Sequence, residues 1–389
     1  MDHLGHVLIR SDLNVPTIEG KVLDNFRIKK ALENYQEIEK MSESVTYVSH
    51  LGRPKIEDVV SKDSLTLKPI GLEMSNILNK KVDFIPDIDN LASVIQDSEH
   101  NRDEGSRVYL LENLRFNKGE VTNDNIFAEK LSKGFQTYIL DAFGASHRIH
   151  ASIVGMGEFL TCYQGPLMTK EINALNKVLH NTAGGYTILL GGSKISDKLD
   201  LIKNLLPKVS NILIGGGMCF TFLKALGYEI GNSLCEEDFV GRAKQLLDSK
   251  EGSKIVLPVD FGVTLSLQDG ERIEILLENI EKDHIGIDIG EKTVQEFSHI
   301  LYNSETVFWN GPMGIFEQER FCFGTKEMAE IVSNLPAYTI VGGGDSVSAI
   351  SKFSNIEKFN HVSTGGGASL EYLEGKELPG VNIYPPLII

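Results

Sequence analysis

The sequence predicts an α/β protein with two doubly wound parallel sheets. Short apolar runs rich in Val, Ile, Leu and Tyr recur along the 389 residues, and segments with helical spacing lie between them. The runs are nearly continuous and do not alternate with polar residues, which is typical of strands buried on both faces. Strands that alternate with helices form parallel sheets, and ten candidate strands fit two sheets better than one.

Four candidate strands precede a divide in the chain, and six follow it. In chain order they span 6–13, 45–50, 108–113, 137–144, 186–192, 211–217, 254–262, 306–312, 338–344 and 361–367. Helical spacing is clear in 27–41 and 238–250. The divide falls within 162–186, where Gly165-Pro166 precedes a long helical pattern. Because this connection has no low-complexity tract, we expect an ordered helix between two domains.

The composition limits the partners that the protein can have. The formal net charge is −16 and the pI is near 5.1, which argues against nucleic acid or an anionic membrane as the main partner. We expect no secretory signal, because the first residues lack a basic region followed by an apolar core, and no apolar run reaches the length of about 18 residues that a membrane span needs. The four cysteines lack Cys-x-x-Cys spacing and predict free thiols. We therefore expect a cytoplasmic protein.

Three glycine triplets lie in the second half, each between a candidate strand and a helical pattern, at 215–217, 342–344 and 365–367. Glycine at such a junction lets a phosphate approach the backbone N–H groups of a helix start. One triplet alone is as well explained by a tight turn. Several in one domain, beside lysines and acids, favour nucleotide phosphates, although neither a Walker-type loop nor a G-x-G-x-x-G fingerprint is present.

Charged residues lie near these turns. Lys194 and Lys198 are four apart, at what we expect to be the first turn of a helix, and after a Gly-Gly strand end they favour phosphate over a solvated surface pair. Asp345 follows a triplet and either caps the helix or holds Mg²⁺ on nucleotide phosphates. Glu317 either accepts a hydrogen bond from a ribose hydroxyl or faces solvent.

The first half carries a different set of polar residues. Arginines stand at or just beyond four expected strand ends: Arg27, Arg53, Arg115 and Arg148. Four guanidinium forks on comparable loops predict one basic pocket for phosphate or carboxylate. Asp12 and Asn14 could orient a substrate hydroxyl, and His147 and His150 suit hydrogen bonding around an anion better than metal ligation. Two sites on two domains indicate transfer between their ligands after closure.

Nine motifs follow one another along nearly the whole chain: RSDLNVP (10–16), SHLGRPK (49–55), LLENLRF (110–116), DAFGASHRIHAS (141–152), GGSKISDK (191–198), GGGMCFTFL (215–223), WNGPMGIFE (309–317), GGGDS (342–346) and HVSTGGGASLEYLEGKELPGV (361–381). Together they resemble the phosphoglycerate kinase family. The resemblance implies reversible, direct in-line phosphoryl transfer from 1,3-bisphosphoglycerate to ADP in glycolysis, giving 3-phosphoglycerate and ATP. It implies a monomer that uses Mg²⁺.

The resemblance also implies the domain organisation. Two Rossmann-like domains would be joined by a hinge helix and would close for transfer. Residues 1–167 would bind phosphoglycerate, with the C-terminal segment 372–389 packed back on them. Residues 168–371 would bind the nucleotide.

Site residues carry over position by position, still as implications of the resemblance. The acid substrate would be held by Asp12, Asn14, Arg27, His50, Leu51, Gly52, Arg53, Arg115 and Arg148. The nucleotide would be held by Gly192, Lys194, Lys198, Gly217, Gly286, Asn310, Glu317, Gly343, Gly344, Asp345 and Ser346, with Asp345 on Mg²⁺. Catalysis would rest on Arg27, Lys194 and the backbone amides near Gly344 and Gly367, which position and neutralise the transferring group.

Two alternatives stay open beside the kinase. One is a non-catalytic binding protein that keeps the fold, and the presence of Arg27, Lys194 and Asp345 speaks against it. The other is a dinucleotide-dependent oxidoreductase, which the missing fingerprint disfavours. The chain departs from the usual family pattern at Ser11, Leu13, Ser193, Glu291 and in the Gly-Ala-Ser before His147.

Overall fold

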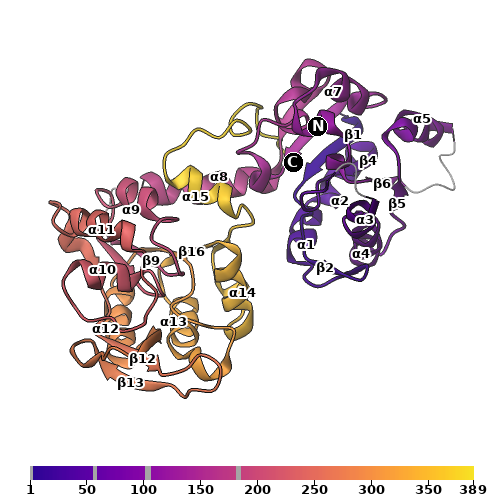
Figure 1. The fold of residues 1–389 in the computed structure, drawn as a ribbon. Coiled ribbons are helices and arrows are strands. Elements are labelled where there is room, and N and C mark those ends of the chain that lie inside the picture. Colours follow the sequence, from indigo (N-terminus) through magenta and orange to yellow (C-terminus); the bar gives the residue numbers. More distant parts are fainter. Residues whose placement is uncertain (1–2, 56–58, 101–106, 181–184) are drawn as a thin grey trace. The chain divides into compact units, whose positions relative to one another are not determined.

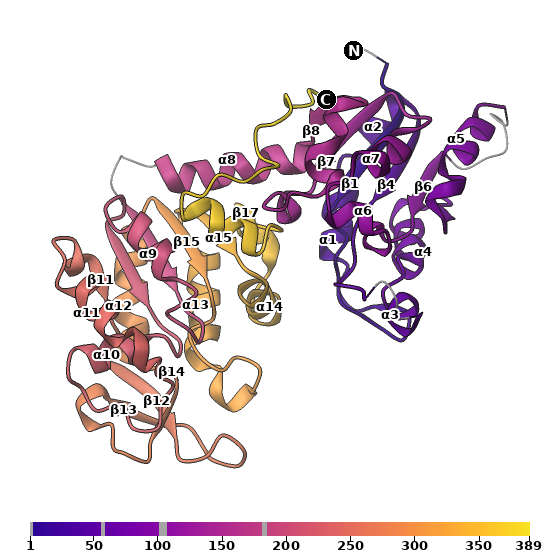
Figure 2. The same ribbon diagram turned by 45° about the horizontal axis from the view of Figure 1, so that its top comes forward.

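The chain folds into two compact α/β units. The computed structural model describes residues 3–55, 59–100, 107–180 and 185–389 (Figure 1, Figure 2). One unit comprises Met1–Ile172 and Glu377–Ile389, and the other comprises Asn173–Lys376. The chain passes from the first unit to the second within helix α8 (Pro166–His180).

The first unit is built on a six-stranded parallel sheet with the order β5-β6-β4-β1-β7-β8. Its strands are β1 (Gly5–Ser11), β4 (Ser42–Val48), β5 (Asp83–Ile85), β6 (Val108–Leu111), β7 (Thr137–Asp141) and β8 (Thr161–Gln164), with a hairpin of β2 (Thr17–Ile18) and β3 (Lys21–Val22). Its helices are α1 (Phe26–Leu32), α2 (Tyr35–Lys40), α3 (Val59–Ser64), α4 (Lys68–Leu78), α5 (Leu91–His100), α6 (Lys118–Val121) and α7 (Asn125–Ser132).

The strand order of this sheet reverses between β1 and β7, because the chain moves from β1 to one side and later returns to the other. Ligands of open α/β sheets bind beyond the carboxyl ends of the strands at such a reversal. Val7, Leu8 and Ile9 follow one another in β1 and are all buried, so both faces of the strand are covered. This burial explains the continuous apolar runs in the sequence.

The C-terminal segment belongs to the first unit. The Gln164 N–H donates to the Pro385 carbonyl at 2.7 Å, and the Leu387 N–H donates to the Gln164 carbonyl at 2.9 Å. The ring of Tyr384 packs edge-on against Tyr138, with 6.3 Å between the centroids. Residues 385–387 therefore lie beside the end of β8, the edge strand of the first sheet.

The second unit repeats the architecture with the order β11-β10-β9-β15-β16-β17. Its strands are β9 (Tyr186–Leu190), β10 (Asn211–Ile214), β11 (Ile255–Val256), β15 (Thr306–Asn310), β16 (Tyr338–Gly342) and β17 (His361–Val362). Its helices are α9 (Leu199–Leu205), α10 (Cys219–Ala225), α11 (Val240–Leu247), α12 (Glu291–Tyr302), α13 (Phe323–Ser333), α14 (Gly344–Phe353) and α15 (Gly367–Leu373). Here the reversal lies between β9 and β15. The predicted class, two doubly wound parallel sheets, is confirmed.

Apolar side chains of α12, α13 and α14 pack on one face of this sheet. Phe297, Met328 and Ile350 come from the three helices and meet Trp309 and Val341 of the strands, and all five are buried.

Among the described residues, no helix combines the length and apolar character that crossing a bilayer requires.

Two expected elements are wrong in detail. The helix expected over 27–41 is two helices, α1 and α2, separated at Glu33 and Asn34. Buried residues keep helical spacing through the break, so periodicity could not reveal it.

The strand expected over 254–262 is also divided, and Pro258, which has no N–H to donate, lies between its parts. The first part is β11 of the main sheet. The second part, β12 (Asp260–Thr264), belongs to an antiparallel side sheet with β13 (Ile273–Leu276) and β14 (Ile285–Ile289). None of the patterns considered above predicted this side sheet.

Candidate active site

In the first unit, the loops after β1 and β4 are joined by hydrogen bonds. An Arg27 guanidinium nitrogen lies 2.9 Å from the carboxylate of Asp12. The side-chain oxygen of Asn14 accepts from the Gly52 N–H at 2.9 Å. Arg115, which follows β6, donates to the Gly52 carbonyl. These five predicted residues therefore come together at the carboxyl edge of the sheet, beyond β1, β4 and β6.

The remaining residues predicted for the first unit differ in how deeply they are buried. His50 and Leu51 are buried, whereas Arg53 is exposed on the same loop. One Arg148 nitrogen lies 3.5 Å from His50 Nε2. Burial is the main cause that holds the pKa of His50 well below its usual range, and the nearby arginines, led by Arg10, act in the same direction. The His50 ring is therefore neutral at physiological pH.

Sequence reasoning missed a buried group behind this surface. Arg10 and Glu120 are completely buried, and Ser152 lies between them. Asn113, also buried, donates to the Leu51 carbonyl at 2.8 Å and so supports the second loop. A signal was available for Arg10, because a charged residue within a strand buried on both faces requires polar partners.

In the second unit, the expected placement of the two lysines is wrong. Helix α9 begins only at Leu199, so Lys194 lies in the irregular loop after β9 and Lys198 stands just before the helix. The reason is tertiary: Glu236 accepts from the N–H and the hydroxyl of Ser196, at 2.9 and 2.7 Å, and thereby holds the intervening turn. Lys194 is exposed.

Lys198 is tied to the ends of two central strands. Its ammonium group donates to the side-chain oxygen of Asn310, and Asn310 Nδ2 donates to the Gly342 carbonyl at 2.6 Å. The hydroxyl of Ser346 accepts from the Gly311 N–H at 2.6 Å and donates to the Gly342 carbonyl at 2.8 Å. Burial lowers the pKa of Lys198 to about 8, against the opposing charges of nearby carboxylates.

The glycine triplet after β16 begins helix α14. Gly343 is the N-cap residue with φ +94°, and exposed Gly344 and Asp345 open the first turn. Gly343, and not Asp345, occupies the cap position, and α14 has no side-chain cap hydrogen bond. The unpaired N–H groups of this turn and the positive end of the helix dipole suit an anion.

The other predicted glycines have different surroundings. Gly192 has φ +100°, and a Cβ on Gly217 would lie 2.9 Å from Leu234 and 3.4 Å from Ser193. A Cβ on Gly286 would overlap the ring of Phe220. Gly367 opens α15. The side chain of Glu317 is exposed, and its carbonyl accepts from Lys352 at 3.1 Å.

Alanine substitutions at Gly343 and Gly344 should show which of these glycines is needed for stability and which for nucleotide binding. At Gly343, alanine must adopt a positive φ, and its Cβ would lie 2.7 Å from Asn310 Nδ2. We expect Gly343→Ala to lower the free energy of unfolding by about 1–3 kcal/mol, measured by denaturant titration. At Gly344, no described heavy atom lies within 4 Å of an added Cβ. Gly344→Ala should keep full stability and weaken nucleotide binding. Equal destabilisation by both changes would contradict this assignment.

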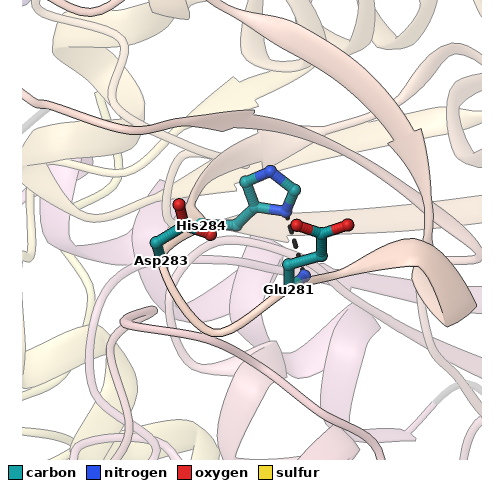
Figure 3. Close-up of side chains that lie close together, drawn as sticks. All are labelled: Glu281, Asp283 and His284. Atoms are coloured by element: carbon teal, nitrogen blue, oxygen red, sulfur yellow. Dashed lines mark hydrogen bonds between the residues drawn. The ribbon is translucent and has the colours of Figure 1, made fainter.

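One group of three possible metal ligands occurs among the described residues, outside both loop sets. Glu281, Asp283 and His284 lie in one turn, with their ligand atoms within 4.8 Å of one another (Figure 3). His284 Nδ1 already accepts from the Glu281 N–H at 3.0 Å, and both carboxylates are exposed. The group is explained as a hydrogen-bonded surface turn.

Comparison with known proteins assigns the family. Residues 4–376 match the family model described as phosphoglycerate kinase. This chain belongs to the phosphoglycerate kinase family. It is 45% identical over 381 residues to the phosphoglycerate kinase of Finegoldia magna and 44% identical over 382 residues to that of Thermosipho africanus. The alignments cover 97% and 96% of this chain and 95% and 94% of those proteins.

A solved structure agrees with this family assignment. Phosphoglycerate kinase from Coxiella burnetii superimposes with a TM-score of 0.86 at 36% identity, covering 98% of this chain and 97% of that chain. The resemblance inferred from the nine motifs is confirmed, and so is the expected enzyme class, a phosphotransferase of glycolysis.

Proposed function

We propose that the protein transfers a phosphoryl group reversibly from 1,3-bisphosphoglycerate to ADP, giving 3-phosphoglycerate and ATP. The observation that carries the proposal is the pair of loop sets at the two sheet reversals. One presents arginines and the other presents glycine-rich turns with lysines, as a small strongly anionic acid and a nucleotide require. Direct in-line transfer and the closure of the two units that it requires belong to the proposal.

The first unit would bind the acid. Its phosphate and carboxylate suit the guanidinium groups of Arg53, Arg115 and Arg148, and Asp12 and Asn14 would orient its hydroxyl. The remaining predicted contacts to the acid are Arg27, His50, Leu51 and Gly52. Arg27 would also reach the transferring phosphoryl group, since its guanidinium is only partly buried by its pair with Asp12.

The second unit would bind the nucleotide. Gly192, Gly217, Gly286, Asn310 and Glu317 would line the nucleoside pocket. Lys198 would hold the phosphates together with residues 343–346. Lys194 and the backbone amides at Gly344 and Gly367 would neutralise the transferring group as charge spreads over its oxygens.

Asp345 fits a Mg²⁺ ion. Its carboxylate is a hard oxygen ligand, and it is exposed in the first turn of α14, where phosphate oxygens would complete the ligand set. A bound Mg²⁺ neutralises phosphate charge during transfer.

The acidic charge of the chain, −16, supports a protein without nucleic-acid or membrane partners. We place it in the cytoplasm as a monomer.

A coupled assay with ATP, Mg²⁺ and 3-phosphoglycerate tests the proposed function. We expect ADP formation that depends on all three components. Ligand binding without any turnover would favour the non-catalytic alternative and overturn the proposal. NADH oxidation in the absence of coupling enzymes would instead support the oxidoreductase.

Nucleotide binding should take up protons near pH 8. The pKa of Lys198 is lowered to about 8 in the free protein, and a phosphate beside it would raise that pKa. Binding of ADP at pH 8 therefore takes up roughly half a proton, whereas binding at about pH 6.5 takes up almost none. Affinity consequently falls as the pH rises above 8. Calorimetry in two buffers of different ionisation enthalpy measures the uptake. Lys198→Arg should abolish it, and uptake that persists in this variant would assign it elsewhere.

A further inference from the structure

Arg10 is held in one orientation inside the first unit. Its side chain is completely buried in β1. The Nε atom donates to the hydroxyl of Ser152 at 2.9 Å, and one terminal nitrogen donates to the Ser11 carbonyl. The other terminal nitrogen, Nη2, lies 3.1 Å from Nδ1 of His50. A guanidinium fixed by three such contacts cannot turn away from the histidine.

Glu120 contacts Arg10 indirectly, through Ser152. Its carboxylate is completely buried and accepts from the N–H and the hydroxyl of Ser152, at 3.0 and 2.7 Å. The Ser152 hydroxyl therefore gives its proton to Glu120 and keeps a lone pair for Arg10. Burial alone would raise the pKa of Glu120, but His150 Nδ1 at 3.6 Å, the charge of Arg10 and the hydrogen bonds from Ser152 lower it. Glu120 is thus the anionic counterpart of the buried guanidinium.

The position of Arg10 determines the tautomer of His50. A guanidinium has only donors, so Nδ1 facing it must accept, and the single proton of the neutral ring must be on Nε2. Arg148 Nη1, another donor, lies 3.5 Å from Nε2. One neutral ring has a single acceptor nitrogen, so it cannot accept from both arginines. The Arg10 contact is shorter and its side chain is buried, whereas Arg148 is only half-buried, so Arg10 prevails.

Two donors that face each other require an acceptor between them. The Nε2–H of His50 and the Arg148 guanidinium have this relation, and an anionic oxygen between them would accept from both. Protonation of the ring is opposed by burial and by Arg10, Arg148, His150 and Arg27, which lower its pKa. We propose that Glu120 and Ser152 position Arg10 so that it fixes His50 as the neutral Nε2–H tautomer, which with Arg148 binds an oxyanion of the acid substrate. The substrate's identity rests on the proposed function, whereas the tautomer does not.

The wild-type protein tests the tautomer directly. Long-range ¹H–¹⁵N correlation spectra of the imidazole nitrogens, with His50 assigned from a His50→Gln sample, should show an Nε2–H ring from about pH 5.5 to about pH 8. An Nδ1–H ring, or titration with an ordinary pKa of about 6.5, would overturn the inference. Addition of 3-phosphoglycerate should shift the Nε2 resonance. An unmoved resonance would overturn the oxyanion assignment, while absent turnover alone would overturn only the proposed function.

A double variant tests the positioning residues. Arg10→Met with Glu120→Gln removes both buried charges together, so neither is left uncompensated. We expect His50 to titrate within the measured range and the KM for 3-phosphoglycerate to rise about tenfold at pH 8. The rise should be smaller at pH 6, because an imidazolium replaces part of the lost positive charge.

Ser44→Ala is the matched control. It removes a buried hydrogen bond of 2.7 Å to His6 near the start of β4, whereas His50 follows the end of that strand, and it should leave the titration of His50 unchanged. A double variant whose His50 titrates as in the wild type would show that Arg10 and Glu120 have only a structural role.

Discussion

Arg27→Ala should lower kcat by about 10²–10³-fold, with a much smaller change in the KM for 3-phosphoglycerate. The Arg27 guanidinium is held 2.9 Å from Asp12 at the carboxyl end of β1, and other arginines remain to bind the acid. A donor that meets the phosphoryl group during transfer contributes to the transition state more than to ground-state binding. Steady-state kinetics in both directions measure the two parameters. Equal losses in binding and turnover would contradict the catalytic role.

Two controls accompany this variant. Lys29→Ala removes an exposed cation from the same helix and should leave kcat unchanged. Arg27→Lys keeps the charge but loses the planar fork, and we expect an intermediate rate. Thermal unfolding of all three variants shows whether the Asp12 carboxylate, only 8% exposed, destabilises the fold once its partner is removed.

Lys194→Ala should lower kcat by about 10³-fold without affecting stability. Cations that neutralise a transferring phosphoryl group contribute factors of roughly 10³–10⁵. Lys194 is exposed in the loop after β9, so its removal leaves the packing of the second unit intact. Single-turnover measurements with saturating ATP and 3-phosphoglycerate isolate the transfer step. The dissociation constant of ADP should change far less than the rate.

Lys203→Ala is the matched control, because Lys203 is an exposed lysine on the adjacent helix α9. It should retain the wild-type rate. Lys198→Ala should differ from both variants by weakening nucleotide affinity more than the rate, as expected for a lysine bonded to Asn310. If Lys194→Ala reduced affinity and rate equally, Lys194 would be a binding residue only.

Local patterns predicted the architecture well because each pattern reflects a local physical cause. Continuous apolar runs indicate strands that are covered on both faces, and both sheets contain such strands. Parallel strands place the loops that follow them at one edge, so the order of strands and loops along the chain predicts one basic pocket that contains Arg27, Arg53, Arg115 and Arg148. The nine motifs lie at the carboxyl ends of the strands in both sheets, where the loops that carry ligand-binding residues begin.

Errors arose where distant contacts override local pattern. The turn before α9 is held by Glu236, forty residues along the chain from Ser196, so Lys194 and Lys198 do not share a helix face. The helix expected over 27–41 divides although its apolar spacing continues. The local pattern around Gly286 also gives no sign that an added Cβ there would overlap the ring of Phe220, which lies more than sixty residues earlier in the chain.

The sequence by itself determined the α/β class, the family and the charged groups that its loops present, because these depend on periodicity and residue type. Only the tertiary structure determined the protonation states and the orientations of those groups. Burial keeps His50 neutral, Arg10 beside Nδ1 makes Nε2 the donor, and Glu120 and Ser152 hold Arg10 in place. Such states depend on burial and on contacts across more than a hundred residues, which no local window contains.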